Sequence, residues 1–205
     1  MLRSERELSI VEIADRLALP KTTIYGWVSD LPLQRRRRDN PHPGNVAACL
    51  MHRERRESAY GVGRREFASL AAMPTFRDFV CLYIAEGTKR SRNSVAIANS
   101  TPAVCILADR WIKAMTRRKL EYWLQHHADQ SLPALRRFWG STLAVPPDMI
   151  TLQRKSNSGQ LRGRTWRSRY GVLTIRTNDT LFRARLQAWM DCLQEEWLDS
   201  AAPGA

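Results

Sequence analysis

Residues 79 to 87 read Phe79-Val80-Cys81-Leu82-Tyr83-Ile84-Ala85-Glu86-Gly87, and they decide how the rest of the chain is interpreted. The stretch is apolar almost throughout and stops at one carboxylate followed by glycine. Its spacing predicts a helix that is N-capped by Thr75 and ended by Gly87 in the left-handed conformation. Cys81 and Ala85 stand four residues apart, so a second helix can approach this face closely. The plain alternative is a buried core helix with a solvated acid at its end.

The stretch resembles the signature helix of the LAGLIDADG family, whose motif ends in a small residue, an acid and glycine. The positions that match are Leu82, Ala85, Glu86 and Gly87, with Cys81 where the family has glycine. The chain departs from the family by carrying glutamate in place of the usual aspartate, and bulkier residues at Val80 and Tyr83. The resemblance extends over residues 73 to 199 through the order of their predicted elements.

The resemblance implies a role for the end of this helix. In the family, two such helices pack through small residues, and the acid at each end binds a divalent metal at the DNA cleavage centre. In an active enzyme Glu86 would be catalytic and would bind Mg²⁺, while Cys81 and Ala85 would form the dimer interface. Because the chain has one motif, cleavage would require a homodimer. Lys89 and Lys119 are candidates for a basic residue near that centre, although no motif assigns them.

The chain is strongly basic. Its 205 residues include 33 Lys and Arg against 20 Asp and Glu, which gives a formal charge of +13. Such a balance favours a polyanionic partner, and nucleic acid is the commonest, with an anionic membrane surface as the competitor. No apolar run approaches the roughly 18 residues of a membrane span, and the N-terminus lacks a signal peptide core, so we expect a cytoplasmic protein. Four scattered cysteines predict neither disulfides nor a zinc site.

Residues 8 to 33 predict two short helices joined by a tight turn. Ser9 is a suitable N-cap for the first helix, and the second extends from Lys21 to Asp30. Leu19 is predicted to fill the turn. Hydrophobic spacing predicts an apolar face on the first helix made of Ile10, Ile13, Ala14 and Leu17, and the second helix is predicted to bury Ile24, Trp27 and Val28. Two helices joined in this way place the second in the major groove of DNA. The residues expected to contact bases and phosphates are Lys21, Thr22, Thr23 and Tyr25.

This stretch resembles the helix-turn-helix of resolvases and small bacterial repressors. The alternative is a helical hairpin that binds another protein. A linker with two prolines and a glycine follows, and it contains four consecutive arginines. Of these, Arg35 and Arg36 are candidates to lie along phosphates, although a solvated charge run is an equal alternative. Residues 45 to 70 predict a connecting helix that is interrupted at Gly61-Val62-Gly63.

The rest of the chain predicts helix, strand, helix, strand, helix, strand, strand, helix. Residues 119 to 127 predict a strand with Leu120, Tyr122 and Leu124 on one side, and residues 149 to 155 and 169 to 177 predict a hairpin. The order resembles the LAGLIDADG αββαββα unit with one extra helix, whose sheet forms a saddle over the major groove. The hairpin loop has no acid, and its basic residues are predicted to bind the DNA backbone: Arg154, Lys155, Arg162, Arg164, Arg167 and Arg169. The alternative is an exposed mobile loop.

The sequence therefore predicts an α+β chain with four parts. They are a helix-turn-helix region at residues 1–33, a basic linker and connecting helix at 34–72, a LAGLIDADG-like domain at 73–199 and a tail at 200–205. The expected function is regulator-like binding of double-stranded DNA, because the resemblance includes sporulation regulators that join a degenerate LAGLIDADG domain to a helix-turn-helix. The alternative is a homodimeric Mg²⁺-dependent DNA endonuclease, and a purely structural interaction protein is the third. Whether the chain is an enzyme stays open.

Overall fold

The computed structural model describes residue 8 and residues 10–29, 43–155 and 168–201. The chain divides into two compact units, residues 1–48 and residues 49–205. The boundary lies within helix α3 (Pro43–Ala71). Each unit is described by itself.

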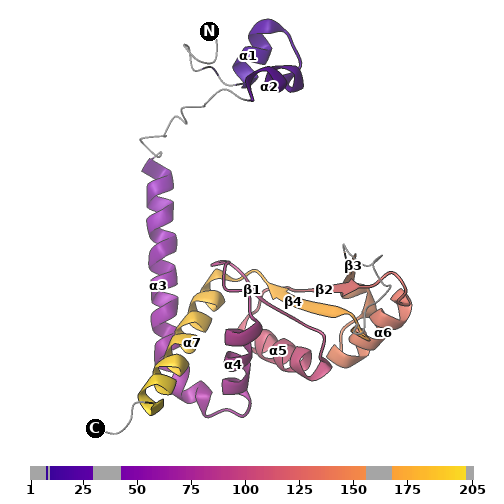
Figure 1. Ribbon diagram of the computed structural model, residues 1–205. Helices are drawn as coiled ribbons and strands as arrows, with labels where there is room; N and C mark the ends of the chain where they lie inside the picture. The colour runs from indigo at the N-terminus through magenta and orange to yellow at the C-terminus, as the bar shows by residue number, and fades with distance from the viewer. Residues whose placement is uncertain (1–7, 9, 30–42, 156–167, 202–205) are drawn as a thin grey trace. The chain divides into compact units, whose positions relative to one another are not determined.

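The first unit is built from two short helices, α1 (Ile10–Leu17) and α2 (Lys21–Val28), as the hydrophobic spacing predicts (Figure 1). The turn between them passes through Ala18, whose φ of 50° lies in the left-handed region. The Leu19 N–H donates to the carbonyl oxygen of Ala14 at 3.1 Å, which closes the end of α1. The buried residues of this unit are Ile13, Ala14 and Ile24.

Three apolar residues that were predicted to be buried in this unit are exposed. The exposed fraction is 45% for Leu17, 37% for Leu19 and 66% for Trp27, so the prediction is wrong for these positions. Each helix has eight residues, which is little more than two turns. Two helices of that length share only a narrow contact, and the described neighbours do not cover the remaining apolar side chains. The predicted cap at Ser9 lies outside the described residues.

The second unit contains a four-stranded sheet in the order β1-β4-β2-β3. The strands are β1 (Val95–Asn99), β2 (Leu120–His126), β3 (Ile150–Arg154) and β4 (Val172–Thr177). Strand β4 lies between β1 and β2 and is antiparallel to both, whereas β3 is parallel to β2 at the edge. The predicted β3–β4 hairpin is therefore wrong. Helix α6 (Leu132–Leu143) joins β2 to β3, and parallel neighbours require such a crossover.

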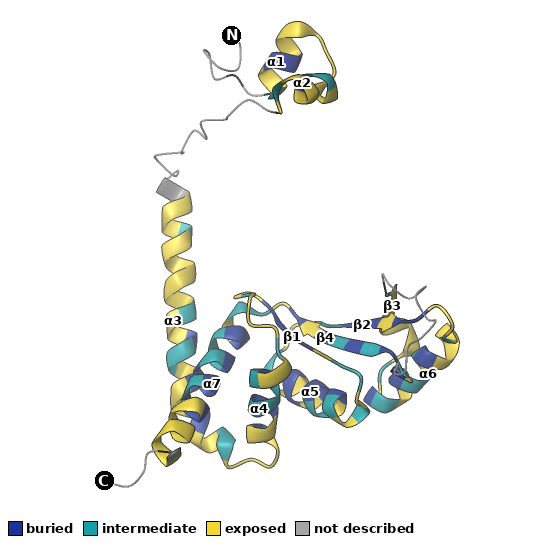
Figure 2. Cartoon of the chain, in the orientation of Figure 1, coloured by how far each residue is buried: buried dark blue, intermediate teal, exposed yellow. Residues whose placement is uncertain are grey.

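Helices pack on one side of this sheet. The helices are α4 (Phe76–Glu86), α5 (Pro102–Met115), α6 and α7 (Thr180–Ala201), and the predicted order of elements is confirmed. In Figure 1, α4, α5 and α6 lie on the same side of the strands. The core between them joins strand residues such as Leu124 and Ile175 to Trp139 and Trp189. The unit is therefore an α+β structure, as predicted. Figure 2 shows that α3, by contrast, is exposed over most of its length.

The two ends of α4 differ from the predicted caps. Thr75 has a φ of 67°, and its hydroxyl accepts a hydrogen bond from the indole N–H of Trp111 at 3.1 Å instead of capping the helix. Gly87 is extended, with φ −71° and ψ 148°, and forms a bridge with Ile97. A Cβ at Gly87 would lie 2.5 Å from the carbonyl oxygen of Tyr83. Glycine is required here by a close approach and not by a left-handed turn.

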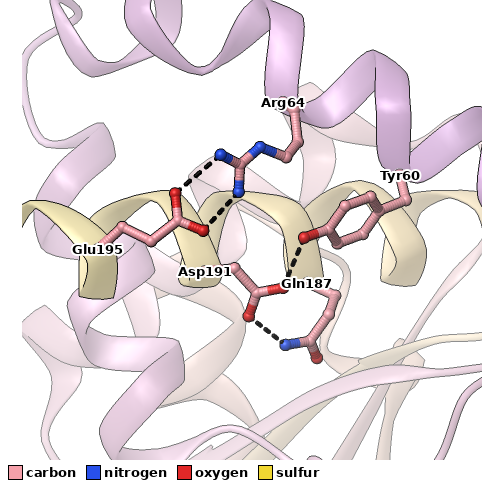
Figure 3. Close-up of polar contacts among 5 residues, drawn as sticks. All are labelled: Tyr60, Arg64, Gln187, Asp191 and Glu195. Atoms are coloured by element: carbon pink, nitrogen blue, oxygen red, sulfur yellow. Dashed lines mark hydrogen bonds and ion pairs between the residues drawn. The ribbon is translucent and has the colours of Figure 1, made fainter.

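Helix α3 continues through the two glycines that were predicted to interrupt it, so that prediction is also wrong. A Cβ at Gly63 would lie 2.7 Å from the carbonyl oxygen of Arg185, so this glycine lets α3 and α7 approach closely. Polar side-chain contacts also join these two helices, and the contact between them is called the α3–α7 seam below (Figure 3). Arg64 donates to both carboxylate oxygens of Glu195, at 2.7 and 2.8 Å.

Candidate nucleic-acid interface

The first candidate surface is the exposed side of α2. Lys21 and Thr22 are exposed, Tyr25 is 61% exposed, and Thr23 is half-buried. Because Ile24 is buried against α1, the residues on its other side face solvent. An ammonium group, a hydroxyl and a phenol are therefore available at the start of a helix, and these groups hydrogen-bond base edges and phosphates.

The second candidate surface is the side of the sheet that faces away from the core. Along β2, Tyr122 and Leu124 are buried, while Trp123 is 39% exposed and Gln125 is exposed. The strand register places Trp123 between Thr174 of β4 and Thr151 of β3. The neighbouring positions on the same face are Glu121, Gln125, Gln153 and Arg176. This face offers amide, hydroxyl, carboxylate and guanidinium groups around one aromatic ring, whose indole N–H donates to Glu121 at 3.4 Å. Such groups read and stack on bases.

The sequence alone does not single out these sheet residues. The alternation of residues 119 to 127 predicts the apolar side of the strand, which carries Leu120, Tyr122 and Leu124. In a strand the intervening positions necessarily point the other way. The signal was therefore present at Glu121, Trp123 and Gln125. What the sequence lacked was the strand order, which places Thr174 and Thr151 beside Trp123.

Basic residues lie near one end of the sheet. Arg154 ends β3 and is exposed, and the Lys155 N–H donates to the carbonyl oxygen of His126 at 3.0 Å. Arg169 is exposed, with its guanidinium carbon 5.2 Å from the ring centroid of Tyr170. These three predicted residues flank the same end of β2. The predicted residues that lie outside the described part of the chain are Arg35, Arg36, Arg162, Arg164 and Arg167.

The predicted dimer face of α4 remains accessible. Ala85 and Glu86 are exposed and Cys81 is half-buried. Lys89 and Lys119 are both exposed. Within the part of the chain that the structure describes, no three His, Cys, Asp or Glu residues are grouped closely enough to hold a metal ion. One copy of the chain therefore does not fit a Mg²⁺ centre at Glu86, because a single carboxylate is a poor site for this cation.

A buried polar group fixes β2 to the helix layer. The phenol of Tyr122 donates to Asp109 at 2.7 Å, and the ammonium group of Lys113 lies 2.6 Å from the same carboxylate. Burial, followed by the hydrogen bond to Asp109, raises the pKa of Tyr122 well above its usual value. The phenol is therefore neutral at physiological pH and acts as an anchor. The anchor holds β2 in place, which also fixes the backbone that carries Trp123.

Comparison with known protein families, with curated proteins and with solved structures finds no match to this chain. The functional interpretation therefore rests on the residues described above. Among the helices of the described ranges, none has both the length and the apolar character needed to cross a membrane.

Proposed function

We propose that this chain is a regulator-like protein that binds double-stranded DNA through two surfaces. The first is the exposed start of α2, acting as the recognition helix of a helix-turn-helix. The second is the polar face of the sheet, acting as the reading surface of a LAGLIDADG-like domain. The observation that carries the proposal is the polar side of α2, where Lys21, Thr22 and Tyr25 are exposed beside a helix pair held by Ile24.

Charge and shape support this proposal. A formal charge of +13 attracts the phosphate backbone at long range. An α-helix fits the major groove, so the N-terminal residues of α2 would meet base edges there. The sheet face supports a second contact because its side chains can hydrogen-bond, and because Arg154 and Arg169 at its end can meet phosphates.

A selection from random DNA duplexes tests the first surface. Wild type should enrich one sequence, and Thr22→Ala with Tyr25→Ala should relax the preference at the contacted positions by about 1–3 kcal/mol for each base that is no longer read. Val11→Ala is the matched control, since Val11 is exposed and belongs to α1 and not to α2. An unchanged enriched sequence in the double variant would refute a reading role for α2.

The salt dependence of DNA affinity tests the second surface. Replacing Arg154 or Arg169 by glutamine should weaken binding to all sequences alike and should lower the slope of log K against log salt by about 0.9 for each phosphate that is no longer neutralised. Arg110→Gln, an exposed arginine on α5, is the control for net charge. A slope equal to that of Arg110→Gln would show that this end of the sheet does not touch the backbone.

The second candidate function is a homodimeric DNA endonuclease. The accessible face at Ala85 and Glu86 favours it, since a second copy could pack there and bring a second Glu86 alongside the first. Phosphodiester hydrolysis at a centre of this kind depends on acids that hold Mg²⁺. Glutamate has one more methylene group than the aspartate of the family motif, so each carboxylate would lie farther from its helix.

Three variants separate the nuclease from the regulator. Ala85→Leu should abolish both dimerisation and cleavage, and Glu86→Gln should abolish cleavage while DNA binding is retained. Asp148→Asn, at an exposed acid after α6, is the control. Absence of cleavage by wild type with Mg²⁺ or Mn²⁺, together with equal Mg²⁺ binding by wild type and Glu86→Gln on DNA, would exclude the nuclease.

A further inference from the structure

A basic cavity of about 440 Å³ lies within the second unit, between α3, the loop that follows α4 and the first turns of α7. Its charged lining residues are Arg56 and Glu57 of α3, Lys89 and Arg92 of the loop, and Arg183 of α7. The volume is within the roughly 300–1,000 Å³ of small-molecule sites. No residue of this lining belongs to either of the DNA-reading surfaces proposed above.

Arg183 is the unusual member of this lining. It is only 6% exposed, yet it forms no ion pair with any residue that the structure describes. Its Nη1 donates to Gln187 at 3.0 Å, and its Nη2 makes one long bond of 3.5 Å to the carbonyl oxygen of Lys89. Its Nε has no acceptor among the described residues. A buried guanidinium without a counter-ion is unfavourable, because these two hydrogen bonds and the ring of Tyr83, whose centroid lies 5.9 Å from the guanidinium carbon, replace only part of the hydration that burial removes.

The surrounding charges do not neutralise Arg183. Arg56, Lys89 and Arg92 add three cations to the same cavity. The one acid in the lining, Glu57, is bonded to Arg53 at 2.7 Å. Like charges gathered around a concave surface raise the local positive potential, which favours an anion inside it.

A hydrogen-bonded chain of Tyr60, Asp191 and Gln187 (Figure 3) orients the side chain of Gln187, which accepts from Arg183. The Gln187 amide donates to Asp191 at 2.8 Å, and the Tyr60 phenol donates to the other oxygen of Asp191 at 2.9 Å. Because its amide nitrogen is bound to Asp191, Gln187 presents its oxygen to Arg183. The guanidinium is therefore held in place before any ligand arrives, which lowers the entropic cost of binding.

We propose that this cavity is a phosphate-binding site with Arg183 at its base and Lys89 and Arg92 at its rim. A phosphate group matches four cations better than a carboxylate does, because it carries up to two negative charges and more acceptor oxygens. The phosphate can belong to a free small molecule or to a nucleic acid backbone. The site does not depend on the DNA-reading function, since it uses neither α2 nor the open face of the sheet.

Titration of the full-length ¹⁵N-labelled protein with inorganic phosphate and with adenosine monophosphate tests the site, at an ionic strength held constant with sodium chloride. The arginine Nε–H resonance that is missing in Arg183→Gln should shift and saturate in wild type. Arg183→Gln should weaken phosphate binding at least about tenfold, the loss expected for a charge-assisted hydrogen bond. Arg110→Gln, on α5 and outside this cavity, should bind as wild type does.

The same variants distinguish the two sources of phosphate. Loss of binding to the free probes in Arg183→Gln identifies a small-molecule site. If only duplex DNA binding weakens, and its salt slope falls by about 0.9, the phosphate belongs to the nucleic acid backbone. If Arg183→Gln does not fold, the double variant Lys89→Gln/Arg92→Gln carries the test, because both side chains are exposed. Wild-type affinity for both kinds of probe in the folded variants would overturn the proposal.

Discussion

The two units of this chain use the same helical hydrophobic spacing with different results. In residues 1–48, Ile13, Ala14 and Ile24 form the whole buried cluster among the described residues, and large apolar side chains such as Trp27 remain exposed. In residues 49–205, Phe76 is fully buried between Trp111 and Trp189, with both ring centroids 5.1 Å away. Spacing along a helix therefore selects a face, but burial requires a second surface large enough to cover it.

The largest expected effects come from removing one buried side chain in each unit. Phe76→Ala should lower the free energy of unfolding of the second unit by about 3–5 kcal/mol, because it opens a cavity between the indole rings of Trp111 and Trp189. Ile24→Ala should lower the free energy of unfolding of the first unit by about 2–5 kcal/mol. A core of three buried residues contributes too little stability to offset that loss. We therefore expect Ile24→Ala to unfold the first unit entirely.

Indole N–H resonances during urea unfolding check this pair, with Trp27 reporting on the first unit and Trp189 on the second. Ile24→Ala should change Trp27 alone, and Phe76→Ala should lower the midpoint seen at Trp189. A simultaneous change at both indoles in either variant would mean that the two units unfold as one.

The next largest effect distinguishes two glycines of α3. Gly63→Ala should destabilise the second unit by about 1–3 kcal/mol, since the new Cβ would meet the backbone of α7 and force the two helices apart. Gly61→Ala is the matched control, because its Cβ would meet only the end of Arg65 at 3.4 Å. There alanine should stabilise by about 0.5–1 kcal/mol through its helix propensity. Equal midpoints for the two variants in urea unfolding would contradict the close α3–α7 approach.

These positions show which features local sequence could predict. The helices and strands from α4 onward and their order followed from periodicity and turn residues, and they are correct. The role of each glycine was not predictable, because Gly63 contacts residues of α7 that are far away in the sequence, and Gly87 contacts the backbone of the preceding turn. Likewise, the strand order depends on a crossover through α6, and the spacing of residues 149 to 177 predicts a hairpin equally well.

The candidate sites also differ in whether local sequence could predict them. The exposed positions of α2 could be selected from sequence, because they lie on the sides of the helix that do not carry the buried Ile24. The basic cavity could not, because Arg56, Lys89 and Arg183 come from three separate segments. Lys89 was selected only as a neighbour of Glu86. Nothing in its local sequence indicates that its carbonyl oxygen lies beside a buried guanidinium.

A smaller effect compares one alanine in each unit. Ala18 and Ala144 have φ values of 50° and 51°, the left-handed region that favours glycine. Replacing either by glycine relieves about 1–2 kcal/mol of strain and loses about 0.4–1 kcal/mol to the more flexible unfolded chain. We expect a net stabilisation of between about 0 and about 1.6 kcal/mol. The indole N–H resonance of Trp27 would report it for Ala18→Gly, and that of Trp189 for Ala144→Gly. A loss of stability in either variant would show that the methyl group contributes more by packing than it costs in strain.

The smallest expected effect concerns charge at the α3–α7 seam. The hydrogen bonds from Arg64 hold the pKa of Glu195 below its usual 4.5. A carboxyl whose pKa is lower in the folded state stabilises the fold above 4.5 and loses that contribution as the pH falls through the lowered value. Both side chains are about half exposed, at 41% and 53%, so solvent screens most of the interaction.

Glu195→Gln should therefore lower the urea midpoint slightly at neutral pH, and the difference from wild type should vanish in acid. Added salt should shrink the neutral-pH difference as well, because it screens exposed charges. Glu54→Gln is the control, since Glu54 is an exposed acid of α3 with no ion pair among the described residues. A difference that persists unchanged into acid would mean that Glu195 acts through packing. The charge of this pair would then add nothing to the contact between α3 and α7, which would rest on the close approach at Gly63 and on the contacts of Tyr60 with Asp191 and of Glu66 with Arg185.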